Sequence, residues 1–156
     1  MTTTRFIPLS ANETLKYYPQ YFREDITCFL ILKDQPHDSG KLVGLYGLID
    51  QGVDPETGYR LGEAFLTIFP AFRYRTLSKG FFLGLFDHAF DSGFERVYTW
   101  TKLTSWQKLF ERFEPLGIER LNRPPFWDLD PGKVWFVKEK DPKTESRKGD
   151  DDVFWW

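Results

Sequence analysis

Residues 65–80 read FLTIFPAFRYRTLSKG, an apolar segment that runs through a proline into a basic loop. The apolar half is rich in β-branched and aromatic residues, as strands are, and Pro70 cannot continue a central strand. From Leu77 onward the apolar residues fall at offsets 0, 4, 5, 8, 9, 12 and 13, which is the spacing of one helical face. This stretch therefore predicts a strand, a basic loop and a helix that buries one side.

Prolines, glycines and capping residues divide the rest of the chain into short elements. Residues 10–13 have the sequence of a capping box and predict a helix that ends at Pro19. Residues 104–107 repeat the pattern and predict another helix, which Pro115 and Gly117 end. Apolar segments predict strands over residues 26–32, 41–50, 59–69, 96–101, 118–121 and 134–138. The order is strand, helix, three strands, helix, strand, helix and two strands, which predicts an α/β fold with a mixed sheet.

The length and composition are those of one domain with an aromatic-rich core. The chain has 156 residues, of which 16 are Phe, 7 are Tyr and 6 are Trp, and 41% are hydrophobic. We expect residues 1–140 to form this domain, because from Asp141 the sequence becomes charged and rich in turn-forming residues. Residues 141–156 are predicted to be a flexible tail with an acidic and aromatic end.

Charge and cysteine content exclude several classes of function. The chain has 21 Lys and Arg and 23 Asp and Glu, and the net charge of −2 offers no electrostatic basis for binding nucleic acid or an anionic membrane. No apolar run approaches the length of a membrane span. One Cys and two His, in no metal-binding spacing, predict that no metal is bound. We therefore expect a cytoplasmic protein in reducing surroundings.

The basic loop before the predicted helix has the features of a phosphate-binding site. A loop that opens a helix presents unpaired N–H groups at the positive end of the helix dipole. Gly80 lets the backbone come close to a ligand, and Arg73, Arg75 and Lys79 add positive charge. An ordinary strand-to-helix turn with solvated basic residues has the same pattern, so both interpretations stay open.

The hexad Arg75-x-x-Ser78-x-Gly80, after a strand and a proline, resembles the cofactor-binding motif of the GNAT superfamily of acyl-CoA-dependent N-acyltransferases. The first and last positions match, and serine replaces the middle glycine. A second segment, from residues 93–97 to 115–118, resembles the strand, the helix and the Leu-Gly ending of that family. The resemblance covers roughly residues 4–140 and implies a mixed, mostly antiparallel central sheet flanked by helices.

The resemblance implies an enzyme that transfers an acetyl or related acyl group from acetyl-CoA to an amine acceptor, either a small molecule or a protein. The loop and first helical turn would contact phosphate, and backbone N–H groups at the end of the strand would hold the acyl carbonyl. The implied cofactor-binding residues are Ile68, Phe69, Arg73, Arg75, Thr76, Leu77, Ser78, Lys79 and Gly80. Two family features are missing: residues 101–105 contain no Asn, and Phe113 stands where a Tyr often protonates the leaving thiolate.

Glu63 is the candidate catalytic base, in a strand where the family frequently keeps a catalytic carboxylate. Counting by two places it on one face with Leu61, Phe65 and Thr67. Aromatic neighbours disfavour the charged form of a carboxylate, which suits a general base. The alternative is a carboxylate on an edge strand that faces water or pairs with Arg60.

A second function fits the missing family features, namely a catalytically inactive GNAT-fold protein that only interacts with partners. Short, aromatic-rich chains with few motifs resemble proteins carried by bacteriophages, in which a GNAT-like chain serves virion assembly or host takeover. Residues 75–80 and Glu63 favour the enzyme. The absent Asn and Tyr and the aromatic tail favour the interaction protein.

Several other residues with reactive or adhesive side chains have alternative explanations. His88 lies one residue off the helical stripe and is expected to flank it, and Cys28 is expected in the core. Gly44 and Gly47 either line a cofactor channel or allow close packing. The dipeptide Phe126-Trp127, in a proline-rich loop, either forms a contact surface or folds back over the sheet.

The end of the tail has three acids followed by Val153, Phe154, Trp155 and Trp156. Soluble proteins seldom expose two indoles, so this end either docks on its own domain, over Phe126-Trp127, or binds a protein partner. A partner groove would be apolar with a basic rim, because the acids and the terminal carboxylate need countercharge. We predict that Phe154, Trp155 and Trp156 contact such a partner.

Overall fold

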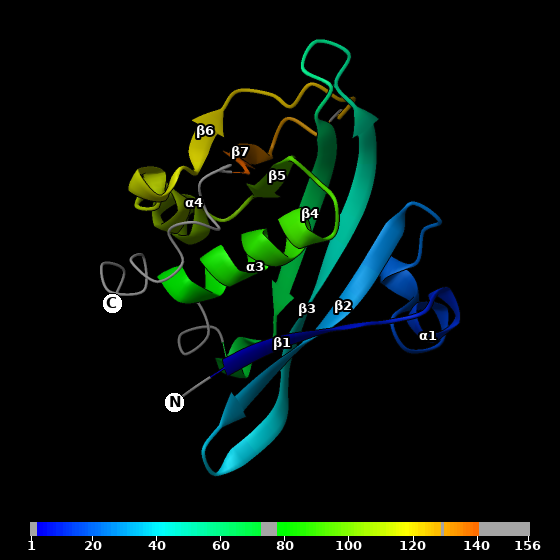
Figure 1. The fold of residues 1–156 in the computed structure, drawn as a ribbon. Helices are drawn as coiled ribbons and strands as arrows, with labels where there is room; N and C mark the ends of the chain where they lie inside the picture. The colour runs from blue at the N-terminus through cyan, green and yellow to red at the C-terminus, as the bar shows by residue number, and fades with distance from the viewer. Residues whose placement is uncertain (1–2, 73–77, 129, 141–156) are drawn as a thin grey trace.

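In the computed structural model, which describes residues 3–72, 78–128 and 130–140, helices pack on a seven-stranded sheet (Figure 1). The strands are β1 (Thr3–Pro8), β2 (Ile26–Gln35), β3 (Asp38–Val53), β4 (Arg60–Ile68), β5 (Arg96–Thr101), β6 (Glu119–Leu121) and β7 (Val134–Glu139). The helices are α1 (Ala11–Tyr17), α3 (Lys79–Asp91) and α4 (Thr104–Glu111), with the 3₁₀ turns η1 (Pro19–Tyr21), η2 (Pro70–Phe72) and η3 (Glu114–Leu116). In the described ranges no helix is long and apolar enough to cross a membrane.

The sheet order is β1-β2-β3-β4-β5-β7-β6, and β4 and β5 are its parallel pair among antiparallel neighbours. The predicted order of elements is confirmed, and so is the mixed, mostly antiparallel sheet. Strand β3 begins earlier than predicted, because β2 and β3 join through the two-residue turn at Pro36 and His37 and pair from Gln35 onward. The α3 crossover links the two parallel strands, as a parallel pair requires.

One of the two predicted capping boxes is confirmed. Ser10 Oγ accepts the Glu13 N–H at 3.1 Å, and the Glu13 side chain accepts the Ser10 N–H at 3.0 Å. The second prediction is wrong, because α4 starts at Thr104 itself and Leu103 is its N-cap without a side-chain hydrogen bond. The nearby hydroxyl that binds backbone is Thr101 Oγ1, which accepts the Leu103 N–H at 3.1 Å.

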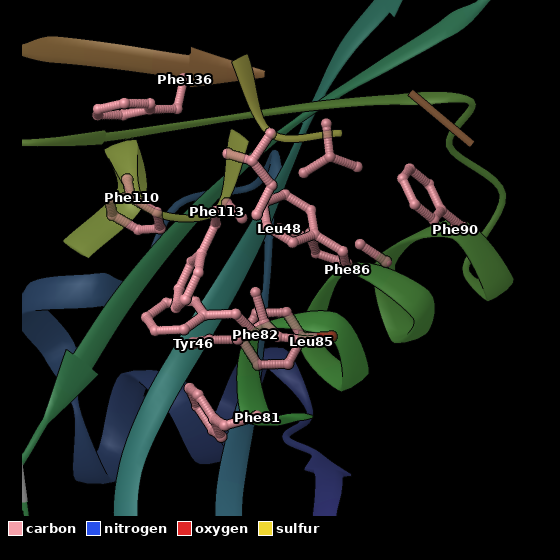
Figure 2. Packing of buried hydrophobic residues seen from close by; sticks show 14 of the residues in the cluster. Tyr46, Leu48, Phe81, Phe82, Leu85, Phe86, Phe90, Phe110, Phe113 and Phe136 are labelled. Carbon is pink, nitrogen blue, oxygen red and sulfur yellow. The ribbon is translucent and has the colours of Figure 1, made fainter. Parts of the chain in front are cut away.

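Helices α3 and α4 cover one face of the sheet with phenylalanine rings (Figure 2). The helical stripe predicted from the sequence is buried at every described position: Phe81, Phe82, Leu85, Phe86, Ala89 and Phe90. The Phe82 ring contacts Phe110 and Phe113, with ring centroids 5.1 and 5.3 Å apart. Gly93 follows α3 with a φ of 109°, a left-handed conformation that favours glycine after a helix.

The opposite face is covered by η1 and by the loop 122–133. The Tyr21 ring stacks on Phe65 at 5.4 Å, while Phe126 packs edge-on against Tyr98 and Trp135. Phe126 therefore folds back over the sheet, whereas its neighbour Trp127 is 83% exposed. The fold-back alternative is thus confirmed for Phe126, and a contact role for Trp127 stays a prediction.

Gly44 and Gly47 allow close packing between β3 and β4. A Cβ at Gly44 would lie 2.2 Å from the backbone oxygen of Thr67, and one at Gly47 would lie 2.2 Å from the Phe65 ring. Any larger residue at either position would force neighbouring atoms apart. The packing explanation therefore accounts for both glycines.

His88 lies between α3 and the sheet, half-buried, where its Nδ1 hydrogen-bonds with the Tyr46 hydroxyl. The rings of Phe6 and Phe29 lie 4.9 and 4.7 Å from the imidazole. Burial lowers the pKa of His88 below its usual value, although the Asp91 charge opposes this, and burial raises the pKa of the Tyr46 phenol. The pair is therefore neutral at pH 7.

This pair predicts a loss of stability in mild acid. The stabilisation from neutral His88 is complete above the unfolded-state pKa of about 6.5 and is lost as the pH falls through the lowered folded-state pKa. Substituting His88→Gln should flatten the fall in melting temperature between about pH 7 and pH 5, because glutamine takes no proton there. His37→Asn, at the exposed histidine of the β2–β3 turn, should keep the wild-type slope. Equal slopes for wild type and His88→Gln would contradict the prediction.

Candidate active site

The parallel strands β4 and β5 separate after a short ladder. Their paired positions run from Leu61 with Arg96 to Ala64 with Thr99, while β4 continues to Ile68. At the last paired position the Thr99 hydroxyl donates to the Ala64 carbonyl oxygen at 2.9 Å. The backbone of β4 beyond Ala64 therefore faces a gap where a neighbouring strand would otherwise lie.

A small apolar pocket occupies this gap. Leu66 of β4, Phe82 of α3 and Trp106 of α4 are among its lining residues, and so is Thr99 of β5. The cavity volume is about 20 Å³, which is the space of about one water molecule. This pocket, as the described residues line it, is therefore too small for anything larger than a water molecule.

The first turn of α3 contains three of the predicted cofactor-binding residues. Ser78 is the N-cap, and its Oγ accepts the Phe81 N–H at 3.1 Å. Lys79 and Gly80 begin the helix. The remaining predicted phosphate contacts, Arg73, Arg75, Thr76 and Leu77, lie outside the described residues. Another cation is close to this loop, since the Lys41 ammonium lies 5.4 Å from the centroid of the Phe72 ring.

The end of β4 carries the two residues predicted to hold an acyl carbonyl. The Phe69 N–H donates to the Val43 carbonyl oxygen of β3 at 2.9 Å, so it points away from the gap. Successive N–H groups of a strand point to opposite sides. The Phe69 N–H is therefore not directed to the gap, and the predicted role of Ile68 stays a prediction.

Glu63 lies in the middle of the sheet and is 7% exposed. The edge-strand alternative is wrong, because β4 has a paired strand on each side, and Arg60 pairs instead with Asp50 at 2.6 Å. Glu63 Oε1 accepts a hydrogen bond from Gln51 Nε2, and Oε2 accepts one from Trp100 Nε1, each at 2.9 Å. Two neutral donors thus hold a buried carboxyl group.

Cationic partners of Glu63 are absent from the part of the chain that the structure describes. A buried carboxylate without a countercharge is costly, and an ammonium group of a ligand would supply that charge. Glu63 immediately precedes Ala64, the last paired residue of β4, and its side chain projects from the face opposite α3. The carboxyl group is therefore next to the gap but on the other side of the sheet from the helix.

Gln51 and Trp100 are site residues that the sequence analysis missed. Trp100 alternates with Tyr98 along β5, a pattern that predicts a shared face but no particular contact. Gln51 lies in a β3 irregularity between Asp50 and Val53, where the register with β4 shifts. The pairing of β3 and β5 with β4 brings both side chains to Glu63.

The position of the missing family tyrosine is part of the core. Phe113 is 3% exposed and packs against Phe82 of α3, so it has neither a proton to donate nor access to solvent. The predicted partner contacts Phe154, Trp155 and Trp156, with the rest of the tail from residue 141, lie outside the described residues. Their role stays a prediction.

Comparison with known proteins identifies the fold. No family model and no curated protein matches the sequence. The structure is similar to a domain from Methanocaldococcus jannaschii (TM-score 0.60, 11% identity, covering 90% of this chain and 100% of the other). It is also similar to Arabidopsis thaliana NAA60 in complex with acetyl-CoA (TM-score 0.54, 15% identity, coverage 89% and 98%). A third similar structure is an acetyltransferase of the GNAT family from Staphylococcus aureus (TM-score 0.50, 12% identity, coverage 88% and 99%).

These similarities define the class of fold. The seven-stranded sheet with flanking helices is that of GNAT acyl-CoA N-acyltransferases. Identities of 11–15% establish the fold alone.

The hydrogen bond at the point of separation predicts a measurable loss of stability. Thr99→Val keeps the shape of the side chain but removes a buried hydrogen bond to the Ala64 carbonyl oxygen, and should lower the free energy of unfolding by about 1 kcal/mol. Thr27→Val, at an exposed position of β2, is the matched control and should change stability little. Chemical denaturation of both variants measures the difference. Equal stabilities would show that the Thr99 hydroxyl does not hold the two strands together.

Proposed function

We propose that this protein is an N-acyltransferase that moves an acetyl or related acyl group from acyl-CoA to an amine. The observation that carries the proposal is the buried carboxyl group of Glu63, beside the gap where β4 leaves β5. The gap would give a thioester arm access to the end of β4, while the carboxyl group would lie on the face from which an amine approaches. The fold similarity to acetyltransferases supports this assignment.

The residues around the gap fit an acyl-CoA in three ways. The capped N-terminus of α3, with Lys79 and Gly80, would bind the pyrophosphate together with Arg73, Arg75 and the backbone of residues 76–78. The end of β4 at Ile68 would lie beside the acyl group. The apolar lining at Leu66 and Trp106 would contact the arm, after these side chains move to enlarge the small pocket.

Glu63 would act on the acceptor. Its buried charge favours a bound ammonium group, and the carboxylate would then accept the proton that the amine must lose before attack. Acyl-CoA supplies the activated acyl group, and the nitrogen forms a bond to the acyl carbon as the sulfur leaves. Because Phe113 has no exchangeable proton, solvent would protonate the leaving thiolate. The acceptor would be a small molecule or a protein that carries a primary amine.

The alternative of an interaction protein without turnover also has an observation in its favour. The position of the expected acid is a buried phenylalanine, and the pocket that the described residues line at the gap is small. Binding of acetyl-CoA decides between the two functions.

Saturating acetyl-CoA should raise the melting temperature by about 3 °C or more, because a ligand that binds the native state stabilises it by mass action. Arg75→Ala removes a cation from the phosphate site, and Gly80→Asp adds an anion there. Each should weaken acetyl-CoA binding, measured by calorimetry, by about tenfold or more. Arg23→Ala, at an exposed arginine paired with Asp25, is the control and should bind normally. No thermal shift at millimolar acetyl-CoA would exclude the enzyme and leave the interaction protein.

Glu63→Gln should lower kcat by about 100-fold or more for an acceptor found by screening amines, because glutamine keeps the shape but takes no proton. The acidic limb of the pH–rate profile should flatten, and acetyl-CoA affinity should stay within about twofold, since the carboxyl group is on the acceptor side. Glu119→Gln, at an exposed position of β6, is the matched control. Wild-type rates for Glu63→Gln across pH would assign proton transfer elsewhere.

A further inference from the structure

Trp100, the residue that donates to Glu63, is itself held by a cation. The Lys133 ammonium lies 4.2 Å from the centroid of the Trp100 ring and 5.6 Å from that of Trp135. Trp100 and Trp135 are direct partners across β5 and β7, so the ammonium covers two adjacent indoles. A cation over the face of an indole is attracted to its π electrons and restrains the ring.

Lys133 lies at the end of the loop 122–133, and an aspartate of the same loop holds its ammonium group. Its ammonium donates to Asp128 Oδ2 at 2.8 Å, and the two side chains are 16% and 15% exposed. Asp128 Oδ1 accepts the Asp130 N–H at 2.8 Å, which orients the carboxylate. An ion pair this shielded from water is more rigid than a surface pair, because both groups have lost their solvent alternatives.

We propose that Lys133 and Asp128 are positioning residues that act on Glu63 through Trp100. The contacts form a continuous series: Asp128 orients Lys133, Lys133 restrains Trp100, and the indole N–H binds Glu63 Oε2. The cation also draws electron density from the indole, which makes its N–H a stronger donor to the carboxylate. Together with the hydrogen bond from Gln51 to Oε1, these contacts hold the Glu63 carboxyl group in one orientation beside the gap. This inference rests on the proposed role of Glu63 as the base.

A second lysine–aspartate pair, between the residue after β5 and the loop, serves as a control. Lys102 pairs with Asp130 at 2.5 Å, and its side chain is 53% exposed. This pair also ties β5 to the loop. Of these two lysines, however, Lys133 is the one whose ammonium group lies over Trp100 among the described contacts.

The test measures solvent exchange of the Trp100 indole N–H by NMR in the full chain, with its signal assigned from the loss in Trp100→Phe. Lys133→Met keeps the length of the side chain and its cover over the ring but removes the charge. We expect this variant to exchange at least about fivefold faster and to shift the N–H proton signal upfield, because a weaker hydrogen bond protects less. Lys133→Arg should restore protection, since arginine retains the cation. Lys102→Met should exchange at the wild-type rate.

Two results would overturn the proposal. One is wild-type exchange in Lys133→Met alongside a lower melting temperature, which is what a merely structural ion pair gives. The other is equal acceleration in Lys133→Met and Lys102→Met, which indicates general opening of the loop. Should Lys133→Met not fold, Asp128→Asn removes the anchor of the lysine instead and is expected to accelerate exchange in the same direction. The exchange measurement uses no acyl-CoA. Failure of acetyl-CoA binding would therefore exclude the proposed function, while the effect of Lys133 on Trp100 would still be decided by the exchange rates.

Discussion

The short parallel ladder between β4 and β5 is the constraint on which the rest of this structure depends. The chain can return from β4 to a parallel β5 only through a crossover, and α3 with its preceding loop is that crossover. The ladder ends at Ala64 and Thr99, where a threonine hydroxyl binds the last carbonyl oxygen. Beyond this point the described β4 residues no longer pair with β5, so the two strands separate. The candidate cofactor site and the candidate base are both consequences of this separation.

The aromatic residues have different roles on the two faces of the sheet. On the α3 and α4 face they fill space, and Phe82, Phe110 and Phe113 pack against one another. On the other face they surround a polar centre, where Trp100 donates to Glu63 and Lys133 lies over the Trp100 ring. Aromatic rings suit this second role because they exclude water and still offer an N–H donor and a π face.

The surroundings of the gap and of the candidate base Glu63 differ in chemical character. Phe113 belongs to the apolar core, where its ring packs against Phe82 of α3. Large side chains from both helices, Phe82 and Trp106 among them, also line the small pocket at the gap. Glu63, by contrast, keeps the hydrogen bonds of a positioned carboxyl group. The two hydrogen bonds give this carboxyl group a defined place in the sheet.

The sequence by itself determined the elements, their order, the buried side of α3 and the cap at Ser10. These features depend on residues within one or two turns of each other, so periodicity and capping patterns record them. The second cap was mispredicted because Thr101 and Thr104 both offer a hydroxyl near the start of α4. The path of the chain decides that Thr101 binds a backbone N–H and that α4 starts at Thr104. Tertiary structure alone decided the surroundings of Glu63. Its donors Gln51 and Trp100 are 12 and 37 residues away, and strand pairing, which no local pattern encodes, brings them to one carboxyl group.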